Sequence, residues 1–438
     1  MKKTPVTRHS SLVTFCLLLS AFFLLSSCQR QVEIHPAWSA DAVIYEVNVR
    51  QFTPEGTFNA FAEHLPRLKD LGVDILWLMP MYPIGELERK GTLGSYYAIK
   101  DYTAVNPEFG TLDDFKAMVN KAQQLGFKVI LDWVANHTSP DAVWTVNKDW
   151  YVTDSLGNFV IEYDWTDISK LNFENKDMRR AMTDAMLYWV KETNIDGYRC
   201  DVAGHVPVDF WEAAVKELKA VKPDIFMLAE AEEPPLQHKA FNMYYAWHQH
   251  AVMNQIAKGE ADVNTLRHAL EQMNQRFPDY TIPMFFTSNH DENSWHGTEF
   301  ERMGDGARTF AVLTYLLPGM PLIYNGQEVG FDRRLEFFEK DVIDWNDRSD
   351  YTAFYRELNQ LRKANPALHS QDKGGRLVEI KNTAPTAVFS FQREVKGNKV
   401  TAVFNLTNQQ QPVEFESDCS ELNAITALNP WEYKIFIQ

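Results

Sequence analysis

Short apolar runs alternate along the chain with longer stretches of helical period. Runs of about four to eight apolar residues between turn residues are typical of buried strands, and a period of about 3.6 is typical of amphipathic helices. Eight strands are predicted, at residues 43–52, 74–80, 127–132, 195–201, 225–230, 241–245, 281–288 and 321–324. Helices are predicted at residues 58–71, 112–125, 178–192, 209–220, 263–276, 302–317 and 351–363. This alternation indicates a parallel sheet, and eight repeats fit a closed (β/α)8 barrel, the TIM barrel of the α/β class.

Two stretches depart from this rhythm. Residues 136–175, after the third strand, are rich in aromatic and turn residues and predict a short inserted subdomain. After residue 365 the pattern becomes short alternating strands, which indicates a C-terminal antiparallel β domain, predicted as a β-sandwich. The predicted parts are therefore residues 1–27 (signal peptide), 28–42 (linker), 43–365 (barrel) and 366–438 (β-sandwich). A doubly wound open sheet is the alternative, but no glycine-rich phosphate loop follows the first strand.

The first residues resemble an export signal. Three basic residues precede the apolar run 12–25, which is too short for a comfortable membrane span. The run ends in Leu25-Ser-Ser-Cys28, which resembles a bacterial lipobox whose cysteine is acylated. We therefore expect an exported protein anchored by lipid on Cys28 to the outer membrane, facing either side of it. Ordinary signal cleavage beside an incidental cysteine is the alternative.

Charge and cysteine content narrow the function classes. The net charge is −16, and no basic stripe is visible, which argues against a nucleic-acid partner. Four cysteines occur, of which Cys200 and Cys419 lie outside the signal region and far apart, so no disulfide framework is implied.

Polar residues gather where four of the predicted strands end: residues 132–137, 199–201, 230 and 290–291. In a parallel barrel the carboxyl ends of the strands converge on one face, where catalysis takes place. Carboxylates, an arginine and histidines meet there without a serine or cysteine nucleophile beside a base. This set indicates glycosidic-bond chemistry, which needs one carboxyl group to protonate the leaving oxygen and one carboxylate to face the oxocarbenium ion.

Each carboxyl group is assigned a catalytic role. Asp201 is the predicted nucleophile, and Arg199, two positions earlier on the same strand face, is expected to lower its pKa and keep it ionised. Glu230 is the predicted general acid/base, with a pKa raised by semi-apolar surroundings and nearby carboxylates. Glu232 and Glu233 compete for that role, although a solvated acidic loop suits them better. Asp291 is suited to gripping sugar hydroxyls and stabilising positive charge.

Two histidines complete the predicted sugar-binding set. His137 and His290 each stand beside a polar residue at a strand end, which favours hydrogen bonds to one sugar over a structural role. Metalloenzyme chemistry is disfavoured, because no His-Glu-x-x-His or paired-cysteine spacing occurs.

Taken together, these motifs resemble the α-amylase superfamily, glycoside hydrolase family 13, and its exported lipoprotein amylases and neopullulanases. Residues 132–137, 197–203, 229–230 and 288–291 match the family's four conserved regions in order. The resemblance implies a retaining mechanism with Asp201 as nucleophile, Glu230 as acid/base and Asp291 as stabiliser. It also implies that Arg199, His137 and His290 contact the sugar at the cleavage subsite.

Further positions are assigned from the resemblance alone. Tyr97 aligns with a tyrosine that stacks on the sugar, with Tyr96 as its competitor because the usual Gly-Tyr-Asp is absent here. His205 and Asn136 resemble positions linked to a structural calcium, the only cofactor considered, since the chemistry requires none. The other positions, which resemble residues lining the cleft but suit loop packing nearly as well, are Asp341 and Trp345.

The predicted function is a retaining hydrolase that cleaves α-1,4-glucosidic bonds in starch-derived maltodextrins. Its partners would be α-linked glucose oligosaccharides or polysaccharides. The same residues would also serve an α-transglucosylase or an α-1,6-glucosidase, and α,α-1,1 specificity stays open. A non-catalytic sugar-binding lipoprotein is the alternative from another class, which the intact set of three carboxyl groups disfavours.

Overall fold

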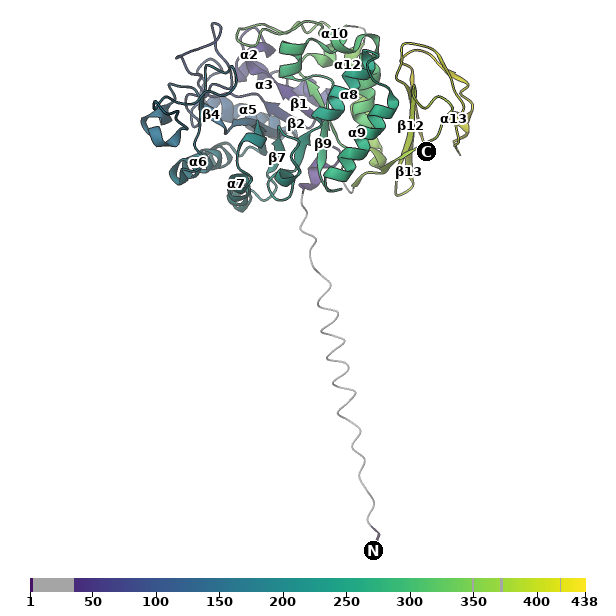
Figure 1. Cartoon of the computed structure of the whole chain (residues 1–438), viewed down its shortest axis with the longest axis horizontal. Helices are drawn as coiled ribbons and strands as arrows, with labels where there is room; N and C mark the ends of the chain where they lie inside the picture. The colour runs from purple at the N-terminus through teal and green to yellow at the C-terminus, as the bar shows by residue number, and fades with distance from the viewer. Residues whose placement is uncertain (3–34, 349, 371–372, 418) are drawn as a thin grey trace. The chain divides into compact units, whose positions relative to one another are not determined.

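Eight parallel strands close into a barrel in the computed structural model, which describes residues 1–2, 35–348, 350–370, 373–417 and 419–438 (Figure 1). The strands are β1 (Ile44–Val47), β2 (Ile75–Leu78), β3 (Lys128–Val134), β6 (Gly197–Asp201), β7 (Phe226–Ala229), β8 (Met243–Tyr245), β9 (Ile282–Phe285) and β10 (Met320–Tyr324). Around the ring the order is β1-β10-β9-β8-β7-β6-β3-β2, so each strand neighbours its predecessor and its successor in the barrel. The predicted (β/α)8 barrel is confirmed.

Inward-facing positions of the strands are apolar at the bottom of the barrel and polar at the top. In β7, Phe226 and Leu228 belong to the buried cluster that fills the interior, and Glu230 follows two residues later. In β6 the same period brings Arg199 and Asp201 to the inner face, because side chains two apart share a side of a strand. The polar carboxyl ends of several strands therefore meet above the apolar side chains that fill the barrel interior.

Gly197 makes room for this arrangement. A Cβ atom at this position would lie 1.9 Å from the carbonyl oxygen of Phe226 on the neighbouring strand, so no other residue fits. The glycine lies two positions before Arg199 on the inner face of β6, which lets β6 and β7 approach closely beneath the guanidinium.

Helices surround the strands, as Figure 1 shows. They are α2 (Val49–Phe52), α3 (Phe58–Ala62), α4 (Leu65–Leu71), α5 (Leu112–Gln124), α6 (Lys176–Thr193), α7 (Val208–Val221), α8 (Trp247–Ala257), α9 (Val263–Arg276), α10 (Glu299–Met303), α11 (Ala307–Leu316) and α12 (Tyr351–Ala364). Two predicted helices are each divided in two. Helix α4 begins at Leu65 after a break at residues 63–64 and has Pro66 in its first turn, and a turn of 3₁₀-helix at residues 304–306 separates α10 from α11.

Two predictions about elements were wrong. The first strand was predicted over residues 43–52, but β1 ends at Val47 and the chain turns into α2. The turn is set by tertiary contacts, because the buried Arg50 guanidinium pairs with Glu108 at 2.9 Å and binds the carbonyl oxygen of Gly94. Helix α8 was not predicted, because polar residues 248–250 interrupt its apolar pattern; two of them, Gln249 and His250, are buried.

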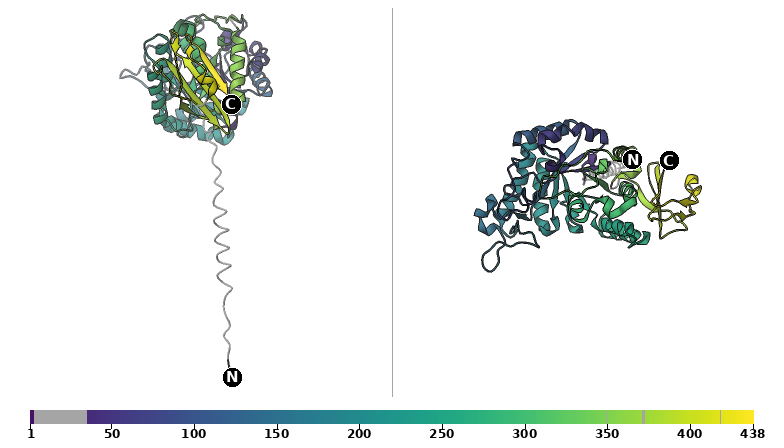
Figure 2. Two further views of the ribbon diagram at one scale, coloured as in Figure 1. Left: turned by 90° about the vertical axis from the view of Figure 1, so that its right-hand side faces the viewer. Right: turned by 90° about the horizontal axis from the view of Figure 1, so that it is seen from above.

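The inserted segment and the C-terminal region flank the barrel. Strands β4 (His137–Thr138) and β5 (Ser169–Lys170) pair within the insertion. The C-terminal sheet contains β11 (Arg376–Glu379), β12 (Val388–Val395), β13 (Asn398–Asn405) and β16 (Tyr433–Ile437), drawn in yellow-green and yellow in Figure 2. It is antiparallel, as predicted.

The second layer of the C-terminal region is small. It consists of the pair β14 (Gln411–Pro412) and β15 (Ala427–Leu428) with the short helix α13 (Ser420–Asn423). One apolar cluster joins this layer to Val388 and Val403 of the larger sheet. The buried Arg393 of β12 links the sheet to the barrel by donating to the carbonyl oxygens of Leu316 and Leu317. The domain boundaries predicted at residues 27, 42 and 365 stay predictions.

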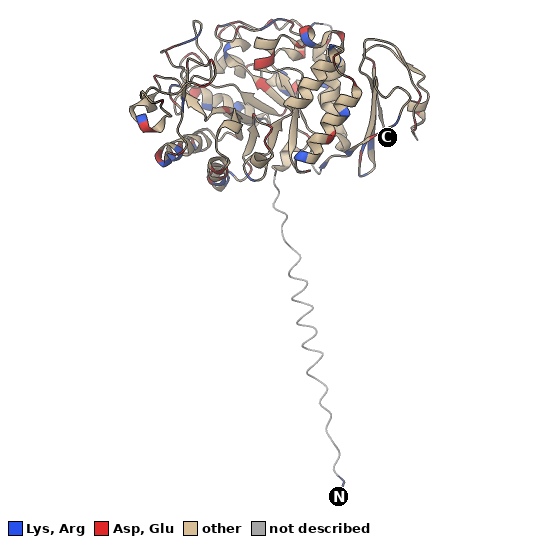
Figure 3. Cartoon of the chain, viewed as in Figure 1, with Lys and Arg blue, Asp and Glu red and all other residues tan. Residues whose placement is uncertain are grey.

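Charges of both signs are interspersed over the helices drawn in Figure 3, in line with the absence of a basic stripe in the sequence. Among the described residues, no helix has the length and apolar character needed to cross a membrane. The predicted signal peptide lies outside the described residues except for Met1 and Lys2, and so does Cys28, the predicted lipid-attachment site.

Candidate active site

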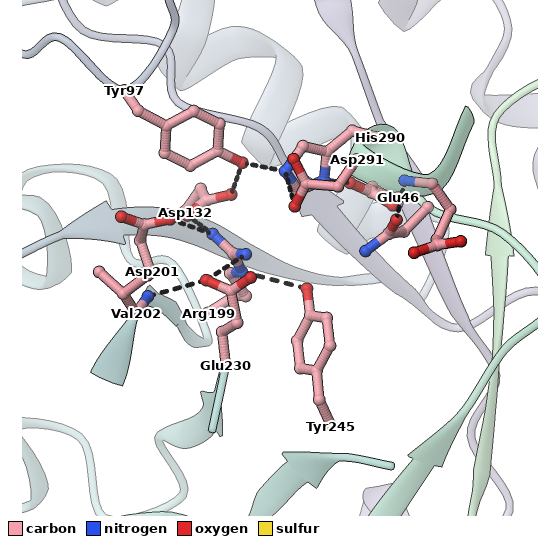
Figure 4. Close-up of polar contacts among 12 residues, drawn as sticks. Glu46, Tyr97, Asp132, Arg199, Asp201, Val202, Glu230, Tyr245, His290 and Asp291 are labelled. Atoms are coloured by element: carbon pink, nitrogen blue, oxygen red, sulfur yellow. Dashed lines mark hydrogen bonds and ion pairs between the residues drawn. The ribbon is translucent and has the colours of Figure 1, made fainter. Parts of the chain in front are cut away.

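The Arg199 guanidinium lies at the centre of the polar strand ends (Figure 4). Its Nη1 atom is 2.8 Å from Asp132 and 3.1 Å from Asp201, and its Nη2 atom is 2.9 Å from Glu230. Its Nε atom donates to the Tyr245 hydroxyl at 3.2 Å. The arginine side chain is fully buried, so its charge is compensated by these partners and not by water. One cation from β6 therefore holds the predicted nucleophile and the predicted acid/base together.

The Glu230 carboxylate is held by the backbone N–H of a residue in a strained conformation, Val202. Its Oε2 atom accepts the backbone N–H of Val202 at 2.8 Å, in addition to the ion pair with Arg199. Val202 has φ 35° and ψ 47°, a left-handed conformation that a β-branched residue rarely adopts. Such conformations cost about 1–3 kcal/mol and cluster at functional sites. Because Oε2 accepts the Val202 N–H and lies against the Arg199 guanidinium, a proton on Glu230 belongs on the other oxygen, Oε1.

Three carboxyl groups share the single positive charge of Arg199. Burial and the charge of Glu230 raise the pKa of Asp201 well above its usual value, against the opposite effect of Arg199. The sequence predicted a lowered pKa for Asp201 from Arg199 alone, which was wrong for the free protein, because the arginine is shared among three carboxyl groups. Burial also raises the pKa of Glu230, in the predicted direction. The pair therefore loses its last proton at a higher pH than isolated carboxyl groups would.

Tyr97 belongs to the site, and its competitor Tyr96 does not. The Tyr97 hydroxyl lies 3.0 Å from Asp132 and 2.8 Å from His290, and its ring stacks on the His290 ring with centroids 5.4 Å apart. Tyr96 is buried with the Arg50 guanidinium 4.1 Å from its ring centroid. Tyr97 is half-buried and is therefore the more accessible of the two tyrosines.

His290 links two further acids to the site. Its Nδ1 atom lies 2.5 Å from Glu46 of β1, and its Nε2 atom lies 3.3 Å from Asp291. Burial alone would lower the pKa of His290, but Asp291 and Glu46 raise it to about 9. The histidine is therefore a cation at neutral pH. Asp291 is 34% exposed, the most open of the three predicted catalytic carboxyl groups.

The remaining predicted positions lie at different distances from this centre. His137 is buried beside the Trp165 ring, and the backbone of Tyr97 hydrogen-bonds to it. The Glu232 carboxylate accepts the backbone N–H of His248, outside the group of carboxyl groups around Arg199. Two positions pack loops instead of lining the site: Asp341 pairs with Arg333, and the Trp345 indole donates to the carbonyl oxygen of Phe52.

Three members of the site were not given a role from sequence. Asp132 was recognised only as part of a motif, yet it accepts from Arg199, from Tyr97 and from the Trp77 indole at 3.1 Å. Glu46 was available as an acid inside an apolar strand, two residues after Ile44. Tyr245 had no distinguishing pattern, since tyrosines are common in barrel cores.

Comparison with known proteins decides the family. The chain matches the catalytic domain of the α-amylases over residues 34–149 and 145–376, most of its length. It belongs to the α-amylase family.

Relatives of this α-amylase-family protein differ in length. An α-amylase of Haloarcula japonica is 29% identical over 402 residues, which cover 86% of this chain and 57% of the relative. The chain thus spans little more than half of that protein. A cyclomaltodextrinase of a Bacillus species is 28% identical over 391 residues, covering 76% of this chain and 68% of the relative.

Solved structures are similar over nearly the whole described chain. An α-amylase from Lactobacillus plantarum has a TM-score of 0.82 at 31% identity, covering 91% of this chain and 99% of that structure. A maltogenic α-amylase from Thermotoga neapolitana has a TM-score of 0.80 at 27% identity, covering 91% and 96%.

The residues at the predicted calcium position do not suit calcium in this α-amylase-family chain. Asn136 and His205 do come together, around the Glu162 carboxylate. However, the Lys170 ammonium forms an ion pair with Glu162, and the His205 imidazole is a nitrogen donor. Calcium takes six to eight oxygen ligands. An ammonium group already supplies the positive charge that a metal ion would bring beside Glu162.

We predict that EDTA leaves the melting temperature unchanged, whereas Lys170→Ala lowers the free energy of unfolding by about 1–2 kcal/mol. The loss arises because Glu162 would keep its charge without its main cation. Lys121→Ala is the matched control, since Lys121 pairs with Glu63 on the exposed surface at 2.8 Å. Thermal and urea unfolding measure both effects. A large drop in melting temperature on chelation would show that a metal ion is bound after all.

We also predict a pH-dependent contribution of His290 to stability. Its pKa is about 9 in the folded protein and roughly 6.5 in an unfolded chain. The stabilisation is thus complete below about pH 6.5 and disappears as the pH rises through 9. Linkage gives a total change of about 3 kcal/mol in the free energy of unfolding.

Urea unfolding at intervals from pH 6 to pH 10 tests this prediction. The stability difference between the wild type and His290→Gln should shrink across that window. His268→Gln, at an exposed position on α9, should give a difference that does not change with pH. A constant difference for His290→Gln would mean that the histidine is not the titrating group.

Proposed function

We propose that this protein is a retaining hydrolase of α-1,4-glucosidic bonds in maltodextrins. The observation that carries the proposal is the bridging of Asp201 and Glu230 by one buried guanidinium, at 3.1 and 2.9 Å. Retaining glycosidases need a nucleophile and an acid/base about 5–5.5 Å apart, and a shared arginine favours this close spacing. Relatives named as α-amylases and cyclomaltodextrinases support the α-glucan as substrate.

The first half of the proposed reaction breaks the glycosidic bond. The Asp201 carboxylate attacks the anomeric carbon while Glu230 gives its proton to the leaving oxygen, so a covalent glycosyl-aspartate forms and the aglycone leaves as an alcohol. The proton comes from Oε1 of Glu230, because Oε2 is held by Val202 and Arg199. In the reactive state the proton of the pair lies on Glu230, and Asp201 is ionised beside the guanidinium.

In the second half, water attacks the anomeric carbon and Glu230 takes its proton. The bond to Asp201 breaks and its carboxylate is restored, so two inversions leave the product in the α configuration. Asp291 and the protonated His290 lie beside Tyr97, where they are placed to bind the hydroxyl groups of a sugar stacked on its ring.

Proton NMR of maltoheptaose digestion tests the proposal. The α anomer of the new reducing end should appear first and then mutarotate to the equilibrium mixture. A β anomer at early times would contradict the retaining mechanism. Products longer than the substrate would identify a transglucosylase. Hydrolysis of isomaltose in a parallel digestion, with maltoheptaose left intact, would identify an α-1,6-glucosidase. Maltoheptaose that is bound while neither it nor isomaltose is cleaved would identify a sugar-binding protein.

We further propose that the mature protein is anchored to the outer membrane by lipid on Cys28. The support is the sequence: a basic start, an apolar run over residues 12–25 and Leu25-Ser-Ser-Cys28. Fractionation of cells that express the full chain tests this, because Cys28→Ser should move the protein from the membrane to the soluble fraction. Unchanged membrane partitioning would contradict a lipid anchor at this cysteine.

A further inference from the structure

A row of aromatic rings continues from Tyr97 into the loop after β10 and on to Trp295. The Phe337 ring lies nearly parallel to Tyr97, with centroids 6.2 Å apart and planes 15° apart. The Trp295 ring follows, and its centroid lies 5.3 Å from that of Phe337 and 5.7 Å from that of Phe338. Phe337 and Phe338 are half-buried, whereas Trp295 is 49% exposed. The row therefore ends in a tryptophan that offers much of its surface to a ligand.

Barrel topology places this row on one side of the site. Tyr97 follows β2 and Phe337 follows β10, and these two strands flank β1. Trp295 follows β9, but its ring packs on Phe337 and Phe338 in the loop after β10, and the carbonyl oxygen of Phe338 accepts the N–H of Leu93 in the loop after β2. In the ring of eight, β10 and β2 each lie three strands from β7, the strand that Glu230 follows. The aromatic row therefore lies beside the loops after β10 and β2, on the side of the barrel mouth away from the proposed proton donor.

The backbone that presents Trp295 is unusual and firmly anchored. Residues 292–296 form a single turn of π-helix, a rare element that is frequent at functional sites. The Asn293 side chain ties this turn to the loop after β10, accepting the N–H of Leu335 at 2.8 Å and donating to the carbonyl oxygen of Arg333. The ring is therefore held in place before a ligand arrives, which lowers the entropic cost of binding.

From this geometry we infer that Trp295 binds the glucosyl unit next to the cleaved one, on the non-reducing side. The inference rests on the proposed function. Glu230 protonates the leaving oxygen, so the leaving part of the glucan lies on the β7 side. The rest of the chain extends from the sugar at Tyr97 toward the loops after β10 and β2, where the Trp295 ring packs on Phe337 and Phe338. A glucose ring has apolar C–H faces that pack on an exposed indole, and this contact favours substrates with at least two glucosyl units before the cleaved bond.

Two chromogenic substrates distinguish the loss of this contact from a general loss of activity. Trp295→Ala should lower kcat/KM for p-nitrophenyl α-maltoside by about tenfold or more. For p-nitrophenyl α-glucoside, whose single glucose stops at Tyr97, the change should stay below about twofold. His296→Ala is the control, because this neighbour on the same turn is 65% exposed and pairs only with Glu292 among the contacts described. Trp295→Phe should recover part of the loss.

Binding gives a second measurement that does not need turnover. In the Asp201→Asn background, calorimetry should show that Trp295→Ala weakens maltotriose by about tenfold while glucose binding is unchanged. Two results would overturn the inference. One is an equal loss of kcat/KM on both glycosides. The other is an unchanged kcat/KM on the maltoside together with an unchanged affinity for maltotriose. A wild type that binds maltotriose through Trp295 but cleaves neither glycoside would instead contradict the proposed function.

Discussion

Asp201→Asn should lower kcat on maltoheptaose by about four orders of magnitude or more, because the variant cannot form the glycosyl-enzyme. Groups that act as one catalytic unit lose about this much singly, and their double variants lose little more. Asp201→Asn combined with Glu230→Gln should therefore be scarcely slower than either variant alone. The change is nearly isosteric, so the melting temperature checks that the fold is intact.

A substrate whose leaving group needs little protonation distinguishes a variant of the acid/base from a variant of the nucleophile. On p-nitrophenyl α-maltoside, whose phenol leaves with little protonation, Glu230→Gln should release a burst of nitrophenol and accumulate the glycosyl-enzyme, visible by mass spectrometry. Asp201→Asn should show neither. Glu232→Gln is the matched control, since this side chain accepts the His248 N–H outside the cluster and should keep full activity. Ordinary turnover by Glu230→Gln would transfer the acid role to Glu232 or Glu233.

Arg199→Met should lower the free energy of unfolding at pH 7 by about 3–5 kcal/mol and abolish measurable activity. Three carboxyl groups would lose their common cation in a fully buried position. Their pKa values would rise further, so the variant should regain stability relative to the wild type as the pH falls from 7 to 5. Urea unfolding at both pH values measures the difference, and Arg199→Lys should lose less than Arg199→Met.

Arg393→Met is the matched control for this pH dependence. Arg393 is equally buried, but its contacts are the carbonyl oxygens of Gly375, Leu316, Leu317, Leu368 and His369. Its removal should cost the same at pH 5 and pH 7, because carbonyl groups do not titrate. A pH-independent loss for Arg199→Met as well would contradict the role of Arg199 as the common cation of the cluster.

Spacing within the chain was sufficient to predict much of the site. Strand period alone placed Arg199 and Asp201 on one face, and the barrel brought Glu230 to the same guanidinium. Local pattern failed where distant contacts decide the conformation. The chain turns after Val47 because Arg50 is bound by Glu108, and nothing in the residues around 50 signals this.

The sequence by itself determined the (β/α)8 repeat, the strand ends that carry the chemistry and the family, because apolar period and motif order are local properties of the chain. Only the tertiary structure decided that Tyr97 and not Tyr96 faces the site, that Lys170 supplies the charge beside Glu162, and that Asp201 has a raised pKa. These features depend on burial and on charges brought together from different strands. A pKa is set by the sum of those surroundings, and this sum exists only after the barrel has closed.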